Sequence, residues 1–262
     1  MNIHYLHPLL LDSAHPITIS LIGAGGTGSN LLTQLGRINH SLKALGHQGL
    51  HVTLYDPDTV SPSNLGRQLF SPTDIGKSKS DLLIHRINAF FGTSWQSVTE
   101  FYGTSDHQHT SNITLTAVDT VSARFEIAQL LQKRAKSPDH SPNKPYYWID
   151  CGNTQQSGQV ILSTVSPITQ PKDSSYQCHA ALPSILSLYP NIKEHESEEL
   201  QGPSCSMAEA LSKQDLFINS MIAQAAAKLL WNLLKEGFTI HQGTFINLDT
   251  MKMSPLKINQ TH

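Results

Sequence analysis

The feature that most constrains the fold is a glycine-rich turn between a β-rich run and a helical pattern. Residues 17–23 (ITISLIG) form a short apolar run of the kind that buried parallel strands show. A G-x-G-x-x-G spacing follows, with glycines at Gly23, Gly25, Gly26 and Gly28. Apolar residues then recur with a helical period from residue 27 to about residue 45. Strand, turn and helix in this order predict a parallel α/β sheet with an anion-binding turn.

Strand and helix patterns alternate along the rest of the chain. Strands are predicted at residues 51–56, 97–101, 113–118, 146–151, 159–165 and 243–250. Helices are predicted at residues 74–90 and 122–136 and, with room for a break, at 207–236. Residues 56–72 hold three prolines and are predicted to form a structured loop. The alternation predicts one domain over residues 1–262, with a Rossmann-like, doubly wound, mostly parallel sheet.

Composition excludes several other classes of protein. The chain has 262 residues, and its formal net charge of −2 gives no sign of a nucleic-acid or anionic-membrane surface. The apolar runs are far shorter than the roughly 18 residues of a membrane span, and the first basic residue is Arg37, so no signal peptide is predicted. Three cysteines exclude a disulfide scaffold and suit a reducing compartment. We therefore expect a cytoplasmic protein.

An acidic residue stands at the end of the strand after the glycine turn. Asp56 occupies the position from which a carboxylate usually accepts the hydroxyls of a ribose. The glycine turn and this residue together fit NAD, FAD or ATP. A tight strand–helix turn without any ligand is the alternative.

The next loop distinguishes among these cofactors. It carries Asn64 and Arg67, and Lys79 follows shortly afterwards. Singly, each residue is more often a surface charge or a turn former. Together, an amide, a planar guanidinium and a compact ammonium suit a triphosphate better than a nicotinamide dinucleotide. The joint pattern therefore favours ATP.

Four motifs resemble the ThiF/MoeB family of adenylating enzymes, which are related to ubiquitin-activating enzymes. These motifs are residues 23–29 (GAGGTGS), 55–70 (YDPDTVSPSNLGRQLF), 74–79 (DIGKSK) and 117–124 (AVDTVSAR). The resemblance runs from about residue 17 to residue 234. More narrowly, the chain is similar to the ThiF-type member of the PRTRC cassette group, through residues 7–11, 45–76, 147–153, 203–219 and 243–248.

The resemblance implies a role for each matching residue. The glycine turn would approach the phosphates, Asp56 would hold the ATP ribose, and Asn64, Arg67 and Lys79 would contact the phosphates. Asp119 would hold Mg²⁺, although Thr120 stands where the family often has asparagine. An alternative is that Asp119 caps the helix predicted from residue 122 and pairs with Arg124. The family also implies a C-terminal antiparallel extension of the sheet.

Two features depart from the family. Some relatives supply an arginine from the N-terminus of a partner subunit, but residues 1–36 hold no arginine or lysine. Many relatives bind structural zinc through two C-x-x-C pairs. Here Cys151, Cys178 and Cys205 stand alone, so no structural zinc site is predicted within one chain.

Cys205 lies just before the predicted final helix, at residues 207–236, and two interpretations of it remain. A thiol at a helix N-terminus has a lowered pKa, and the resemblance implies an acceptor that forms a thioester. A small capping or core thiol is the other interpretation. Cys151 is predicted to lie in the core.

The leading functional hypothesis is ATP-dependent adenylation of the C-terminal glycine of a small ubiquitin-like, β-grasp protein, followed by thioester capture on Cys205. The resemblance implies ATP and Mg²⁺ as cofactors, a conjugating enzyme as a further partner, a homodimer, and a crossover or partner-binding loop at about residues 166–204. An NAD-dependent oxidoreductase and an ATP-binding scaffold without transfer activity are the two alternatives. The first leaves Asn64, Arg67, Lys79 and Asp119 without a role.

Overall fold

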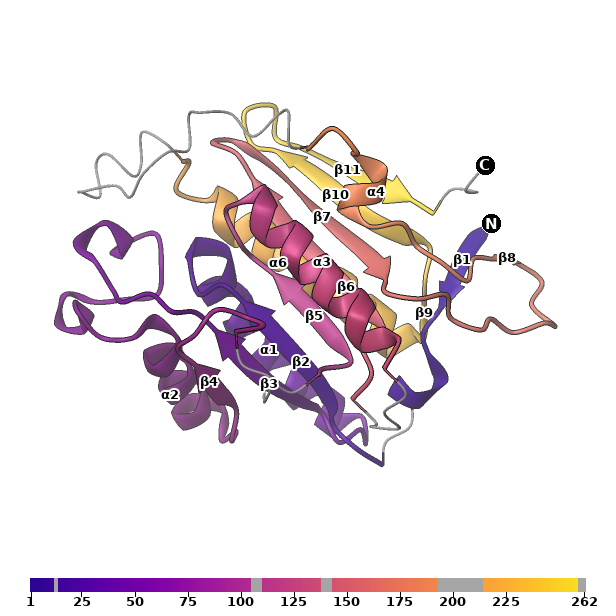
Figure 1. The fold of residues 1–262 in the computed structure, drawn as a ribbon, viewed down its shortest axis with the longest axis horizontal. Helices are drawn as coiled ribbons and strands as arrows, with labels where there is room; N and C mark the ends of the chain where they lie inside the picture. Colours follow the sequence, from indigo (N-terminus) through magenta and orange to yellow (C-terminus); the bar gives the residue numbers. More distant parts are fainter. Residues whose placement is uncertain (12–13, 105–109, 138–142, 193–213, 259–262) are drawn as a thin grey trace.

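The main sheet joins a parallel half to an antiparallel half (Figure 1). The computed structural model describes the whole chain except residues 12–13, 105–109, 138–142, 193–213 and 259–262. Within the described residues, eight strands pair in the order β11-β10-β7-β6-β5-β2-β3-β4. This topology confirms the predicted Rossmann-like, mostly parallel fold with a C-terminal antiparallel extension.

The parallel half holds the predicted glycine-turn strand at its centre. β2 (Ile17–Ile22) pairs with β3 (Leu50–Tyr55) on one side and β5 (Ile113–Thr116) on the other. β4 (Gln96–Val98) and β6 (Tyr147–Asn153) complete this half. The chain thus leaves β2 toward β3 and crosses back to β5, and a crevice forms where the direction of winding reverses.

The antiparallel half lies beyond β6. β7 (Ser157–Thr164) pairs with β6, and β10 (His241–Asn247) and β11 (Lys252–Lys257) follow in turn. The sequence pattern predicted β7 and β10. It did not predict β11, where exposed and half-buried residues alternate at the edge of the sheet.

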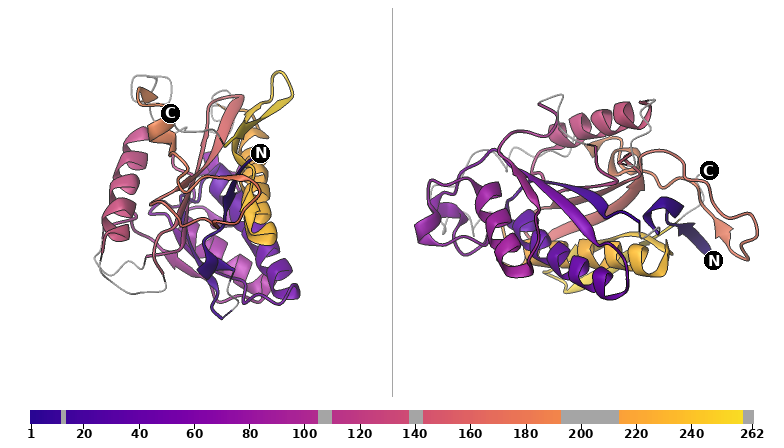
Figure 2. Two further views of the ribbon diagram at one scale, coloured as in Figure 1. Left: turned by 90° about the vertical axis from the view of Figure 1, so that its right-hand side faces the viewer. Right: turned by 90° about the horizontal axis from the view of Figure 1, so that it is seen from below.

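Helices cover both faces of the sheet (Figure 2). α1 (Gly26–Ala44), α2 (Lys79–Phe91) and α6 (Ile218–Glu236) pack on one face, where most of the apolar core lies. α3 (Val121–Ala135) and the short α4 (Ile185–Leu188) cover a second core on the other face, around Tyr55, Trp148 and Leu131. None of the described helices is long and apolar enough to cross a membrane.

One predicted helix begins later than expected, and the first part of another lies outside the described residues. Residues 72–74 form a 3-10 turn, η3 (Pro72–Asp74), and Gly76 takes a φ of +85°, so α2 begins only at Lys79. The side chain of Ser78 caps it by accepting a hydrogen bond from the backbone N–H of Asp81. The final helix begins at Ile218, and residues 207–213 of its predicted span lie outside the described residues.

Within the proline-rich loop, Ser61 and Asn64 form a capping box around a second 3-10 turn, η2 (Pro62–Asn64). A third, η1 (Pro8–Leu10), follows the N-terminal strand.

A small second sheet, which the sequence did not predict, involves the N-terminal segment. β1 (Asn2–Tyr5) pairs in parallel with β8 (Gln177–Cys178) and antiparallel with β9 (Phe238–Thr239). β8 and α4 lie within the predicted crossover loop. Residues 193–204, the last part of that loop, lie outside the described residues.

A buried histidine ties β1 to the main sheet. The His4 side chain is fully buried; its Nδ1 donates to the carbonyl oxygen of His179 at 2.6 Å, and its Nε2 lies 3.0 Å from the hydroxyl of Tyr147. The backbone N–H of His7 donates to the same hydroxyl, so the hydroxyl proton is directed at Nε2 of His4. Burial lowers the pKa of His4, because the charged imidazolium would lose its solvation, although the hydrogen bond to His179 opposes the shift.

We expect the free energy of unfolding to fall as the pH drops below 6.5, the ordinary pKa of histidine. Below this pH the unfolded chain binds a proton at His4, whereas the folded protein does not. The contribution of His4 to the free energy of unfolding is therefore fully present above this pH and is lost below it. Urea unfolding at about pH 8 and about pH 5.5 measures the difference between the two conditions. Burial also lowers the pKa of His7 and His51, so wild type keeps part of the slope without His4.

The variant His4→Gln should therefore show a smaller pH dependence than wild type, whatever its absolute stability. His85→Gln, at an exposed position on α2, is the matched control. An unchanged slope in His4→Gln would contradict the assignment.

Candidate functional site

A cavity of about 810 Å³ opens at the carboxyl ends of the central parallel strands. Gly23, Asp56 and Ala117, each directly after one of β2, β3 and β5, line it together with the first turn of α1. Its apolar lining comes mainly from Ile22, Tyr55, Phe101, Tyr102, Val118 and Ile127, and its polar lining includes Asn64, Arg67, Gln68 and Lys79. An apolar region beside a polar one, at the switch point of a doubly wound sheet, suits a nucleotide.

The glycine turn is built from close backbone contacts. Gly23 has a φ of +97°, and a Cβ there would lie 2.6 Å from the carbonyl oxygen of Ala117. A Cβ on Gly28 would lie 1.8 Å from the carbonyl oxygen of Gly23, and one on Gly26 would meet the side chain of Asn219 at 2.5 Å. A Cβ on Gly25 would meet nothing within 4 Å. Gly23 and Gly28 thus let the turn close, Gly26 makes room for Asn219, and Gly25 leaves room in the cavity.

Asp56 connects this turn to the neighbouring strand. It directly follows β3, and its two carboxylate oxygens accept hydrogen bonds from the backbone N–H groups of Ala24 and Asp58. The side chain is buried, and desolvation raises the pKa of its carboxyl, although the Ala24 hydrogen bond opposes the shift. Asp56 is therefore part of the cavity wall, where each of its carboxylate oxygens already accepts a backbone hydrogen bond.

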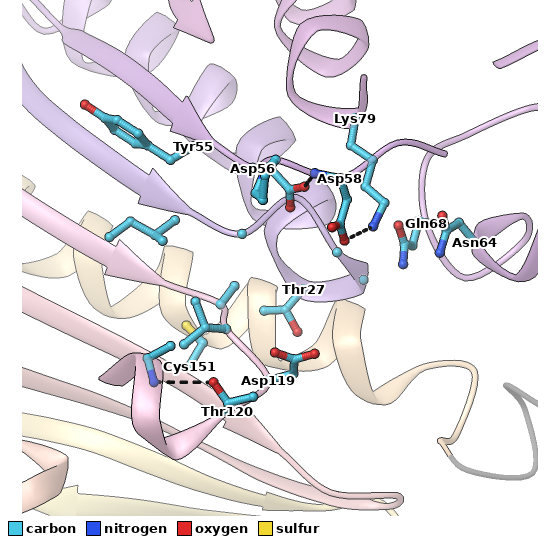
Figure 3. Close-up of a pocket in the computed structure, with 18 of the residues that line it drawn as sticks. Thr27, Tyr55, Asp56, Asp58, Asn64, Gln68, Lys79, Asp119, Thr120 and Cys151 are labelled. Atoms are coloured by element: carbon cyan, nitrogen blue, oxygen red, sulfur yellow. Dashed lines mark hydrogen bonds and ion pairs between the residues drawn. The ribbon is translucent and has the colours of Figure 1, made fainter. Parts of the chain in front are cut away.

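Lys79, Asp58, Asn64 and Gln68 lie at one end of the cavity (Figure 3), and Arg67 also lines this cavity. The Lys79 side chain is 8% exposed, and its Nζ donates to the carboxylate of Asp58 at 2.8 Å. Nη1 of Arg67 donates to Oε1 of Gln214 at 3.0 Å. Asn64 accepts hydrogen bonds from the backbone N–H and hydroxyl of Ser61, within the η2 capping box. The structure thus brings Lys79 to Asp58, 21 positions away in the sequence, and Arg67 to Gln214, 147 positions away.

Two buried polar atoms at this end have no partner among the described residues. They are Nε of Arg67, a donor, and Oε1 of Gln68, an acceptor. Burial also lowers the pKa of Arg67, because the charged guanidinium is partly removed from water. Buried polar groups are normally hydrogen-bonded, so these atoms indicate a place that a polar ligand completes.

Asp119 lies on the opposite wall and does not cap α3. Thr120 is the capping residue, because its hydroxyl accepts the hydrogen bond from the backbone N–H of Ala123. Figure 3 shows the Asp119 carboxylate and the Thr27 side chain directed toward the same open space. The alternative role of Asp119 as a helix cap is therefore wrong, and its exposed carboxylate faces the cavity.

Arg124 also departs from expectation, because it pairs with Asp150 and not with Asp119. The Nε of Arg124 donates to the buried carboxylate of Asp150 at 3.0 Å. Its terminal nitrogens donate to the carbonyl oxygens of Val118 and Thr120, on either side of Asp119. The buried pair thus fixes the loop that carries the Asp119 carboxylate.

Sequence analysis missed several residues of this site. Asp58 partners Lys79, and the D-x-D spacing with Asp56 was the signal that could have drawn attention to it. Asp150, Gln214 and Asn219 come from distant parts of the chain, and no local pattern marks them. They could be found only from the three-dimensional arrangement.

Two of the three cysteines, Cys151 and Cys178, lie within the described residues. Cys151 packs in the core and touches the cavity, as expected of a core thiol, and burial raises the pKa of its thiol. Cys178 is half-buried. Cys205 and residues 193–213 around it lie outside the described residues. In the part of the chain that is described, no cluster of three His, Cys, Asp or Glu residues could hold a metal ion.

Fold and cavity together define a doubly wound α/β protein with a nucleotide-type cleft at its switch point. The chain belongs to the ThiF family, whose family model matches residues 6–262. No curated protein gives a significant match to the sequence.

Solved structures share the fold at low sequence identity. PaaA is 14% identical with a TM-score of 0.60, over 96% of this chain and 67% of that chain. MccB of E. coli, solved with ATP, is 15% identical with a TM-score of 0.55, over 97% of this chain and 67% of that one. The microcin C7 biosynthetic enzyme MccB in complex with N-formylated MccA gives 15% and 0.55, over 97% and 68%. This chain therefore spans about two thirds of the length of these proteins.

Proposed function

We propose that this protein uses ATP to adenylate the C-terminal carboxylate of a peptide or small protein. The observation that carries the proposal is the convergence of Arg67, Lys79 and Asp119 on one cavity beside the glycine turn. A nicotinamide dinucleotide would use the glycine turn and Asp56, but it would leave the two cations and Asp119 without a function.

The chemistry follows from these charges. The carboxylate of the acceptor is ionised at neutral pH, so it attacks the α-phosphorus without a general base while pyrophosphate leaves. Lys79 and Arg67 would stabilise the negative charge on the phosphates, and the Asn64 amide would donate to them. The exposed Asp119 carboxylate suits Mg²⁺, which commonly takes one or two carboxylates together with substrate phosphates. When bound, Mg²⁺ would neutralise phosphate charge.

The ligands, the substrate and the partners are each proposed on separate grounds. MccB has been solved with ATP and with MccA, which supports a nucleotide and a second molecule as ligands of this fold. We propose a ubiquitin-like β-grasp protein ending in glycine as the substrate, on the resemblance of residues 45–76 and 203–219 to the PRTRC group. Thioester capture on Cys205, a homodimer, a conjugating partner and a cytoplasmic location belong to the same proposal.

The experiment is exchange of radiolabelled pyrophosphate into ATP, with and without the candidate substrate protein. Exchange that depends on the substrate supports adenylation. Tight ATP binding without exchange would instead identify an ATP-binding scaffold, and binding of NAD with hydride transfer would identify an oxidoreductase. Both of these outcomes overturn the proposal.

A further inference from the structure

A chain of hydrogen bonds joins the glycine-turn helix to the cationic loop through two amide side chains. The hydroxyl of Thr27, in the first turn of α1, donates to Oδ1 of Asn219 at 3.0 Å. Nδ2 of Asn219, in the first turn of α6, donates to Oε1 of Gln214 at 2.8 Å. The same oxygen accepts from Nη1 of Arg67 at 3.0 Å. We call Gln214 and Asn219 the amide bridge.

The direction of every hydrogen bond in the amide bridge is fixed by its chemistry. Arginine can only donate, so Gln214 must present its oxygen, and Asn219 must then present its amino group to that oxygen. The oxygen of Asn219 therefore faces the Thr27 hydroxyl. Each amide has one orientation that satisfies all partners, which makes the bridge a specific arrangement.

The surroundings of Asn219 fit this arrangement independently. Asn219 is 4% exposed and Thr27 is 5% exposed, so their hydrogen bond is protected from water. The missing side chain at Gly26 provides the space, since a Cβ there would lie 2.5 Å from Cγ of Asn219. Glycine at this position thus serves the amide bridge in addition to the turn.

We propose that Gln214 and Asn219 are positioning residues that orient Arg67 for the phosphates of the bound nucleotide; this inference rests on the proposed function. The bridge takes one of the five N–H donors of Arg67, while the buried Nε keeps no partner among the described residues. A long side chain that is ordered before binding loses less conformational entropy when the ligand arrives. The amide bridge therefore acts on affinity for phosphate and not on the base or ribose.

The test measures the dissociation constants of ATP and of adenosine by calorimetry, on wild type and on Gln214→Met. Methionine has a similar length but no strong acceptor for Arg67. We expect the ATP constant to rise about tenfold, the size expected when one charged hydrogen-bond partner is lost, while the adenosine constant stays unchanged. Gln129→Met, at an exposed position on α3 away from the cavity, is the matched control. Asn219→Asp, which puts an acceptor against Oε1 of Gln214, should reproduce the selective loss.

A double-mutant cycle separates positioning from direct contact. If Gln214 acts through Arg67, then Gln214→Met adds nothing to the loss already present in Arg67→Met. Losses that multiply, or adenosine binding that weakens as much as ATP binding, would overturn the inference. If wild type binds ATP and Gln214→Met binds it equally well, the positioning role of the amide bridge is refuted, whereas the proposed function is not. Wild type that binds no ATP refutes the proposed function itself.

Discussion

Replacing Asp119 by asparagine is expected to reduce substrate-dependent pyrophosphate exchange by about a hundredfold or more, the scale on which removal of one electrostatic group acts in transition states. Asparagine keeps the shape of the side chain and removes its charge. The fold should be unaffected, because the cap of α3 belongs to Thr120 and the Asp119 carboxylate is exposed. Exchange assays over a series of Mg²⁺ concentrations, with thermal unfolding in parallel, measure both effects.

The control variants distinguish the loss of a carboxylate at the cavity from the loss of a carboxylate elsewhere on the surface. Asp249→Asn removes a carboxylate from the exposed turn between β10 and β11 and should leave exchange unchanged. Cys205→Ala should also spare exchange and remove only an adduct that thiols release, because adenylation precedes any transfer to sulfur. Full exchange in Asp119→Asn would refute the proposed metal-binding role of this carboxylate.

The second large effect concerns folding, and the glycine turn supplies its own control. Gly28→Ala is expected to lower the free energy of unfolding by about 3 kcal/mol or more, because overpacking against rigid backbone cannot be relieved locally. Its Cβ would lie 1.8 Å from the carbonyl oxygen of Gly23, so the turn would have to open. Urea unfolding of the purified variant measures the loss.

Gly25→Ala is the matched variant, three residues earlier in the same turn. Its φ of −72° is allowed for alanine, and its Cβ would meet nothing within 4 Å. We expect its stability to stay within about 0.5 kcal/mol of wild type, as for substitutions that disturb no contact. ATP binding should nevertheless weaken about tenfold or more, because the methyl group enters the space through which phosphate approaches the backbone. Undiminished ATP binding in Gly25→Ala would place the phosphates elsewhere.

Local sequence patterns predicted the elements that carry strong short-range signals. The glycine turn, the alternation of strands and helices, and the convergence of Asp56 with the cationic loop follow from spacing and residue type. Pairing between distant segments could not be predicted in this way. β1 joins β8 and β9 across more than 170 residues, and each of these strands is too short to show a period of its own.

The same limit applies to the site. The sequence offered Asp119 as a possible partner of Arg124 because the two are close in sequence, but the partner is Asp150 in β6. Asn219, in α6, and Gln214, shortly before α6, line the cavity because this part of the chain packs against α1. Site residues that lie within the sequence motifs were therefore predictable. Residues that contact them from another helix or strand were not.

The ion pair between Lys79 and Asp58 bears on how an anion enters the cavity. Lys79 is nearly buried, whereas the Asp58 side chain is 64% exposed, so the carboxylate can turn outward into water at little cost. A phosphate that reaches Lys79 therefore replaces one counter-ion with another and does not meet an unmatched charge. Phosphate binding is then an exchange of anions on Lys79. Its free energy is the difference between the contact of Lys79 with phosphate and the contact of Lys79 with Asp58. The charge of Lys79 is thus matched when the cavity is empty, and a multiply charged anion competes with Asp58 better than a single carboxylate does.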